Sequence, residues 1–122
     1  MSTDYSKMSD FDINKLVAIA TGHKQLGSLG WRGLKDGEFN EVMVRGPRKI
    51  GGFDPCNNPA DAWPIIDENN ITIINDNPSF RFAVSEVAAY FNGSNNIWSA
   101  HENGLRAAMI VFLKMQESKN AS

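Results

Sequence analysis

The sequence contains almost none of the features that mark secreted or membrane-bound proteins. Cys56 is its only cysteine, so no disulfide can form within the chain. The longest uninterrupted apolar run, at 107–113, has seven residues, far fewer than the roughly 20 that a membrane-spanning helix needs. Residues 1–12 are polar and acidic and lack the basic-then-apolar pattern of a signal peptide. We therefore expect a soluble cytoplasmic protein with no membrane partner.

The chain also lacks an excess of charge of either sign. Its formal net charge is −2, so no overall electrostatic attraction favours a nucleic-acid partner. The charges are nevertheless uneven. Residues 24–52 contain six basic residues and three acidic ones, whereas residues 53–77 contain five acidic residues and no basic one. A mixed solvated surface is the default explanation; the alternative is a basic segment that meets an anion, or that docks on an acidic segment of its own chain or of a neighbour.

Motifs for catalysis, metal binding or cofactor binding are missing as well. The G-x-x-G-x-x-G spacing at residues 27–33 matches neither the dinucleotide fingerprint nor the P-loop. His23, His101 and Cys56 are too few and too far apart for a structural zinc site. A lone cysteine beside a turn is more often a packing residue than a nucleophile. We therefore expect no metal and no cofactor, and we do not expect an enzyme.

What the sequence does contain is an ordinary globular composition. Its 122 residues suit one domain, and 42% apolar with 21% charged residues is typical of a folded chain. We interpret residues 1–8 as a polar tail. Residues 24–52 are interpreted as a glycine-rich, partly irregular segment, because seven of the ten glycines lie within it.

Helix-start signals stand at three points. Ser9 is expected to cap a helix over residues 10–21, whose apolar side chains recur at helical spacing. Asn58, followed directly by a proline, predicts a second helix over residues 59–68. Asn103 predicts the start of a last helix, which must be well buried because so little of its surface is polar.

Strand signals lie between these helices. The segments 71–74 and 80–84 predict an antiparallel hairpin that turns at residues 75–78. Residues 87–91 fit either a strand or a helix. Further strands are expected at 41–45, at 97–99 and, more weakly, near Trp31. Helices at both ends with strands between them predict an α+β fold in which one antiparallel sheet is covered by helices on both faces, an α-β-α sandwich.

Three long blocks of the sequence carry a family resemblance. They are DYSKMSDFDINK at residues 4–15, FDPCNNPADAWPII at residues 53–66 and WSAHENGLRAAMIVFL at residues 98–113. Together they resemble the phage NinX family, which is encoded in lambdoid phages and prophages of enteric bacteria. More distantly, the layout is similar to a phage domain described as an α-β-α sandwich. The resemblance implies a phage accessory gene and that fold, but no catalytic residues.

The start of the last helix is the candidate ligand site. Its unpaired backbone N–H groups point at one spot, and Arg106 in the first turn opposes the helix dipole, as a cation facing an anion would. Trp98 would offer a stacking surface and His101 a hydrogen-bond donor. Trp63 is the fourth predicted ligand-binding residue. The alternative is that Arg106 pairs with Glu102 and that the tryptophans pack in the core.

Two binding functions compete for this sequence. In the first, a phage accessory protein sequesters a small anionic or nucleotide-like ligand in counter-defence within the infected host. In the second, it binds or inhibits a bacterial host protein through an exposed patch, for which residues 27–52 are available. Self-association stays open in both. A large thermal shift with one nucleotide would favour the first function.

Overall fold

The computed structural model describes residues 4–33, 40–77, 80–85, 98–101 and 103–121. A short 3₁₀ helix, η1 (Tyr5–Lys7), leads into α1 (Asp10–Ala20). The hydroxyl of Ser9 accepts a hydrogen bond from the Asp12 amide at 3.1 Å, which confirms the predicted cap.

A first antiparallel sheet follows, in the order β1-β2-β3: β1 (Lys24–Gln25), β2 (Val42–Arg45) and β3 (Ile50–Phe53). Only β2 was expected. In β2, Val42 and Val44 are buried and alternate with more exposed residues, as strand pleating requires. The chain turns back to β3 at residues 46–49, where the Gly46 amide donates to the Lys49 carbonyl at 2.7 Å. The strand expected near Trp31 is instead a turn.

The second helix, α2 (Pro59–Glu68), has the predicted bounds. The side chain of Asn58 accepts a hydrogen bond from the Ala60 amide at 3.0 Å and caps it. Pro64 lies inside the helix. Because proline has no N–H, Pro64 cannot donate the hydrogen bond that the Ala60 carbonyl would receive in an uninterrupted helix.

A second antiparallel sheet has the order β4-β5-β6: β4 (Ile71–Asn77), β5 (Phe80–Ser85) and β6 (Trp98–His101). The predicted hairpin is confirmed by the β4–β5 register, in which Ile71 pairs with Ser85 and Ile73 with Ala83. Strand β4 continues to Asn77, past the predicted start of the turn. Residues 87–91, for which a strand or a helix was expected, lie outside the described residues.

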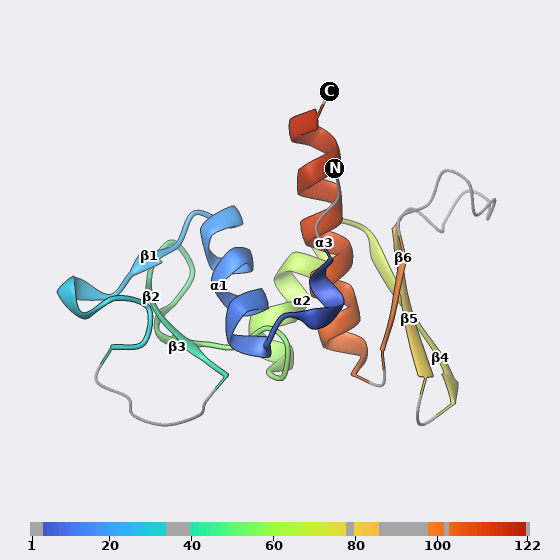
Figure 1. Cartoon of the computed structure of the whole chain (residues 1–122), viewed down its shortest axis with the longest axis horizontal. Helices are drawn as coiled ribbons and strands as arrows, with labels where there is room; N and C mark the ends of the chain where they lie inside the picture. Colours follow the sequence, from blue (N-terminus) through green and yellow to red (C-terminus); the bar gives the residue numbers. More distant parts are fainter. Residues whose placement is uncertain (1–3, 34–39, 78–79, 86–97, 102, 122) are drawn as a thin grey trace.

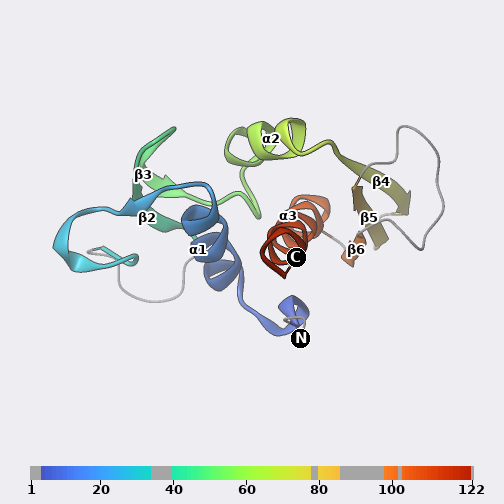
Figure 2. The same ribbon diagram turned by 90° about the horizontal axis from the view of Figure 1, so that it is seen from above.

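The last helix, α3 (Gly104–Ala121), runs through the middle of the molecule. It packs on the β4-β5-β6 sheet on one side and against α1 and α2 on the other, and the β1-β2-β3 sheet lies beyond α1 (Figures 1 and 2). The mixed α+β class is confirmed. The sandwich arrangement is not, because the described strands form two sheets with the described helices between them, rather than one sheet between two helical layers.

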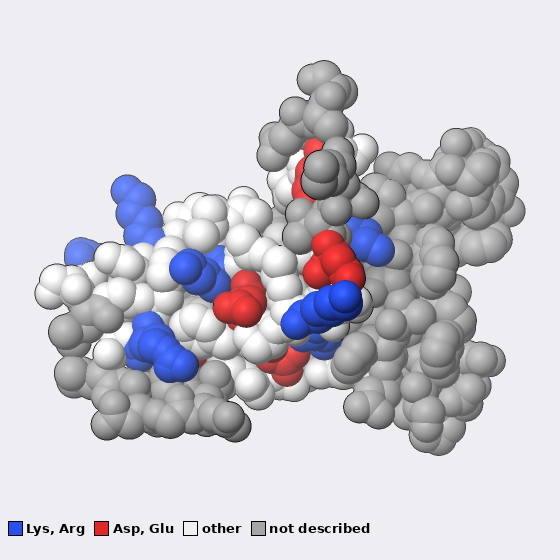
Figure 3. All heavy atoms as spheres, viewed as in Figure 1, with Lys and Arg blue, Asp and Glu red and all other residues white. Residues whose placement is uncertain are grey.

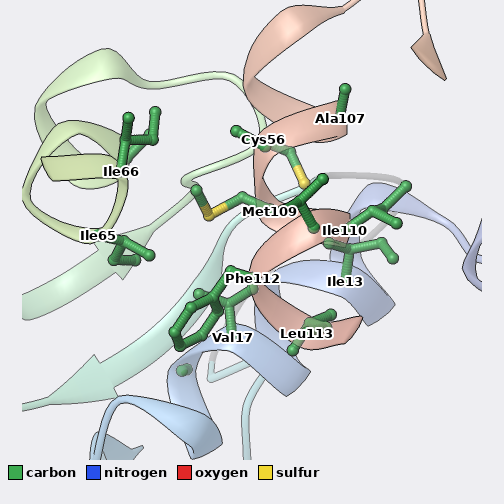
Figure 4. Packing of buried hydrophobic residues seen from close by; sticks show 14 of the residues in the cluster. Ile13, Val17, Cys56, Ile65, Ile66, Ala107, Met109, Ile110, Phe112 and Leu113 are labelled. Atoms are coloured by element: carbon green, nitrogen blue, oxygen red, sulfur yellow. The ribbon is translucent and has the colours of Figure 1, made fainter. Parts of the chain in front are cut away.

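The hydrophobic core lies where the three helices meet (Figure 4). From α3, Met109 and Phe112 are buried against Ile13 and Val17 of α1 and against Ile65 of α2. All five side chains are at most 5% exposed. Burial on this scale explains why the apolar run of α3 has so little polar surface.

Candidate functional site

Arg106, the expected anion-binding cation, is turned inward. Its side chain is buried, and one guanidinium nitrogen donates to Oδ1 of Asp10 at 2.6 Å. Its other terminal nitrogen donates to the carbonyl oxygens of Met8 at 2.7 Å and Tyr5 at 3.2 Å. Arg106 therefore ties η1 and the start of α1 to α3. The alternative partner, Glu102, lies outside the described residues.

Two of the backbone donors at the start of α3 are also in use. Oδ1 of Asn103 accepts hydrogen bonds from the amides of Leu105 at 3.0 Å and Arg106 at 3.3 Å, which confirms the predicted cap. The side-chain nitrogen of Asn103 donates in turn to the Cys56 carbonyl at 2.7 Å. Asn103 thus accepts from two of the backbone donors beside which an anion was expected, and the ligand-binding role of this helix start stays a prediction.

The other three predicted ligand-binding residues are not brought into one described site. Trp98 and His101 form the two ends of β6, and their side chains lie outside the described part of the structure. Trp63 is 48% exposed on α2. Their roles in ligand binding stay predictions.

A cavity of about 350 Å³ lies elsewhere, among the end of α1, the turn at residues 46–49, α2 and α3. The side chains of Phe53 and Phe112 form an apolar part of the cavity wall, and His23 lies beside Phe53. The charged side chains of its lining are two cations and two carboxylates: Arg48, Lys49, Asp61 and Glu68. Ala60 and Pro64, the pair at the helix interruption, also line it.

The two ion pairs in the cavity differ in exposure. The ammonium of Lys49 lies 2.8 Å from Oδ1 of Asp61, whose buried carboxylate also accepts the Asp54 amide at 2.9 Å. Arg48 pairs with Glu68, but both side chains are about half exposed. These contacts confirm one of the sequence alternatives: the basic segment docks on an acidic segment of its own chain.

His23 is the buried titratable group of the cavity wall. Its ring stacks on Phe53 with centroids 4.9 Å apart, and Nδ1 lies 2.8 Å from the hydroxyl oxygen of Thr21. Nε2 is buried and has no hydrogen-bond partner among the residues that the structure describes. Burial, with the nearby Arg48 charge, lowers the pKa of His23, while Asp61 acts in the opposite direction. His23 is therefore neutral at pH 7.

Cys56 has the environment of a packing residue. It is fully buried, and burial raises the pKa of its thiol far above neutral pH. The reactive thiolate is therefore not formed at pH 7. Among the residues that the structure describes, no group of three histidine, cysteine, aspartate or glutamate side chains is placed to hold a metal ion.

The comparison with protein families adds a finding that geometry could not supply. The family model described as "Bacteriophage P22, NinX" matches residues 4–116. The chain belongs to the NinX family. This match spans the segment between residues 16 and 52, which the sequence resemblance did not cover, and therefore includes His23 and Arg48. A comparison with curated proteins finds no match. NinX membership is consistent with a phage accessory protein.

Sequence reasoning missed the cavity residues of this NinX-family chain. It treated His23 only as a spare metal ligand and did not single out Arg48, Lys49 or Asp61. The usable signal was the uneven charge, because the basic segment 24–52 and the acidic segment 53–77 meet at this cavity.

The described surface of the NinX-family chain shows no continuous basic patch on the face of Figure 3. On that face, Lys and Arg side chains are separate from one another or lie beside Asp and Glu. A nucleic-acid interface on this face would need a basic stripe. None of the described helices combines the length and the apolar character needed to cross a bilayer.

Proposed function

We propose that this NinX-family chain is a non-catalytic phage accessory protein that binds a small anionic ligand in the cavity between α1, α2 and α3. Capture of a nucleotide-like host signal in counter-defence is the role that we propose for it. The observation that carries the proposal is Arg48, a cavity-lining cation whose ion-pair partner, Glu68, has an exposed side chain.

The exposure of the two ion pairs determines which of the two cations can bind a ligand. An exposed pair such as Arg48–Glu68 contributes only about 0–1 kcal/mol, so Glu68 can move into solvent while a ligand takes its place. A guanidinium also binds phosphate or carboxylate oxygens in a bidentate manner. Lys49 is held by the buried Asp61, which fixes the position of the turn that carries Arg48.

The size and the walls of the cavity favour a small organic anion over a macromolecule. Its volume of about 350 Å³ lies at the lower end of the range for ligand pockets. Phe53 and Phe112 give it apolar walls suited to a flat or aliphatic group.

Arg48→Gln tests this proposal. A panel of nucleotides, inorganic phosphate and small carboxylates is screened by thermal shift, and hits are measured by calorimetry. We expect Arg48→Gln to weaken binding of a hit by about 10- to 100-fold, the range for a hydrogen bond to a charged group. Arg45→Gln removes the same charge from an exposed β2 position outside the cavity and should leave the Kd unchanged. Equal effects of the two variants would contradict the proposal.

Exposed apolar side chains favour binding of a bacterial host protein as a second candidate. Ile19, Ile50 and Trp63 are 52%, 72% and 48% exposed. Each is the chain neighbour of a cavity-lining residue, so the same elements offer an apolar surface that a partner could cover. A host protein captured by the wild type, lost with Trp63→Ala and retained with Arg48→Gln would support this function over ligand capture.

A further inference from the structure

Glu68 stands at an end of α2 that already has an excess of negative charge. It is the last residue of the helix, where the backbone dipole is negative. Asp67 precedes it, and the last turn of α2 contains no basic residue. Arg48, from the turn between β2 and β3, pairs with Glu68 at this end. Since a helix C-terminus favours a cation, Arg48 compensates the dipole as well as the carboxylate.

The charges of the cavity lining balance while this ion pair is closed. The charged lining residues form two pairs, Arg48 with Glu68 and Lys49 with Asp61. Lys49 is held by the buried carboxylate of Asp61, and it could turn to Glu68 only by leaving that carboxylate uncompensated. When an anion takes Arg48, the lining therefore gains one negative charge, and neither of its two cations is available to Glu68.

We infer that the ligand of the cavity also carries an amino group, best a protonated one, which donates to Glu68 while its anionic group binds Arg48. This inference rests on the proposed anion binding at Arg48. Water can solvate the displaced carboxylate, but it does not restore the positive charge that this end of α2 loses. An ammonium does both, because it offers three donors and a full charge. The exocyclic amine of a nucleobase offers N–H donors without that charge and would form a weaker version of the same contact.

Matched probe pairs test for this second contact. Phenylalanine and 3-phenylpropionate share a ring and a carboxylate at pH 7, but only phenylalanine has an ammonium. The compounds 4-(aminomethyl)benzoate and 4-methylbenzoate differ in the same way, with the ammonium farther from the carboxylate. Binding is followed by amide chemical shifts in NMR titrations. In at least one pair, we expect the ammonium-bearing probe to bind about 3- to 10-fold more tightly, the range for an exposed ion pair at a helix end.

Glu68→Gln is the decisive variant, and Asp67→Asn is its matched control. Both remove one carboxylate from an exposed position in the last turn of α2, but only Glu68 lines the cavity. Neither residue belongs to the hydrophobic core, so both variants should fold. With Glu68→Gln, the two members of a pair should bind about equally. The plain carboxylate should also bind up to about 5-fold more tightly, because it no longer competes with Glu68 for Arg48. Asp67→Asn should change the ratio of the two affinities by less than about twofold, because solvent screens an exposed charge outside the cavity.

The outcomes separate this inference from the proposed function. Equal binding of both members in both pairs, still weakened by Arg48→Gln, would overturn the role of Glu68 and leave anion binding in place. An ammonium preference that survives Glu68→Gln, or that Asp67→Asn removes to the same extent, would overturn it as well. Absence of any binding dependent on Arg48 would overturn the proposed function and remove the basis of the inference.

Discussion

Replacement of Arg106 by methionine tests whether this residue serves the fold or a ligand. Methionine keeps much of the aliphatic packing and removes the guanidinium, so its effect reports the lost polar contacts. Breaking a buried ion pair costs about 3–5 kcal/mol when the remaining charge is uncompensated. Asp10 keeps partial compensation, because it is partly exposed, accepts from the Asn57 side chain at 3.0 Å and lies in the first turn of α1. We therefore expect a loss of about 2–4 kcal/mol in the free energy of unfolding.

Urea denaturation followed by tryptophan fluorescence measures this loss, and Arg45→Met provides the matched control. Arg45 is exposed, so the same substitution there should change the free energy of unfolding by less than about 0.5 kcal/mol. Amide exchange should also accelerate at Met8, whose amide donates to the Tyr5 carbonyl within the segment that Arg106 holds. A loss under about 1 kcal/mol, combined with weaker ligand binding, would refute this reasoning and restore Arg106 as a ligand group.

Two further predictions concern the core and the cavity wall. Phe112→Ala should lower the free energy of unfolding by about 3–5 kcal/mol in urea denaturation, because the ring is 4% exposed among the three helices; a loss under about 1 kcal/mol would show that the helix junction is peripheral. Burial and the Arg48 charge lower the pKa of His23 in the folded chain below its value in the unfolded chain. Below about pH 6.5, the unfolded chain therefore binds a proton at His23 more readily than the folded chain does, so the free energy of unfolding should fall as the pH drops. Denaturation between about pH 5.5 and 7.5 should show this decline in wild type relative to His23→Phe, and parallel curves would contradict it.

Local chemistry made the helix starts predictable. Ser9, Asn58 and Asn103 were assigned as caps, and each accepts the backbone hydrogen bond that a cap provides. A cap depends on residues two or three positions away, so the sequence contains all the necessary information. The hairpin of β4 and β5 was predictable for the same reason, because its two strands follow each other closely in the sequence.

Sheet membership was less predictable because it depends on distant pairing. Strand β3 includes Gly51 and Gly52, which are unfavourable in strands, yet it pairs with β2 through the turn at residues 46–49. Strand β1 is two residues long and pairs across a connection of 16 residues, 26–41. The division of the described strands into two sheets follows from this pairing, and no local sequence pattern predicts it.

Arg106 and Arg48 differ in how deeply their acidic partners are buried. Sequence reasoning expected an anion beside Arg106, either a ligand or Glu102, whereas the described partner is Asp10, 96 positions away in the chain. That partner is partly buried beside a buried guanidinium, so exchanging it for a ligand would leave buried charge uncompensated. The partner of Arg48 is instead a glutamate that is more than half exposed. If Glu68 loses its contact with Arg48, water solvates the freed carboxylate at little cost. Arg48 can therefore exchange this partner for the proposed ligand.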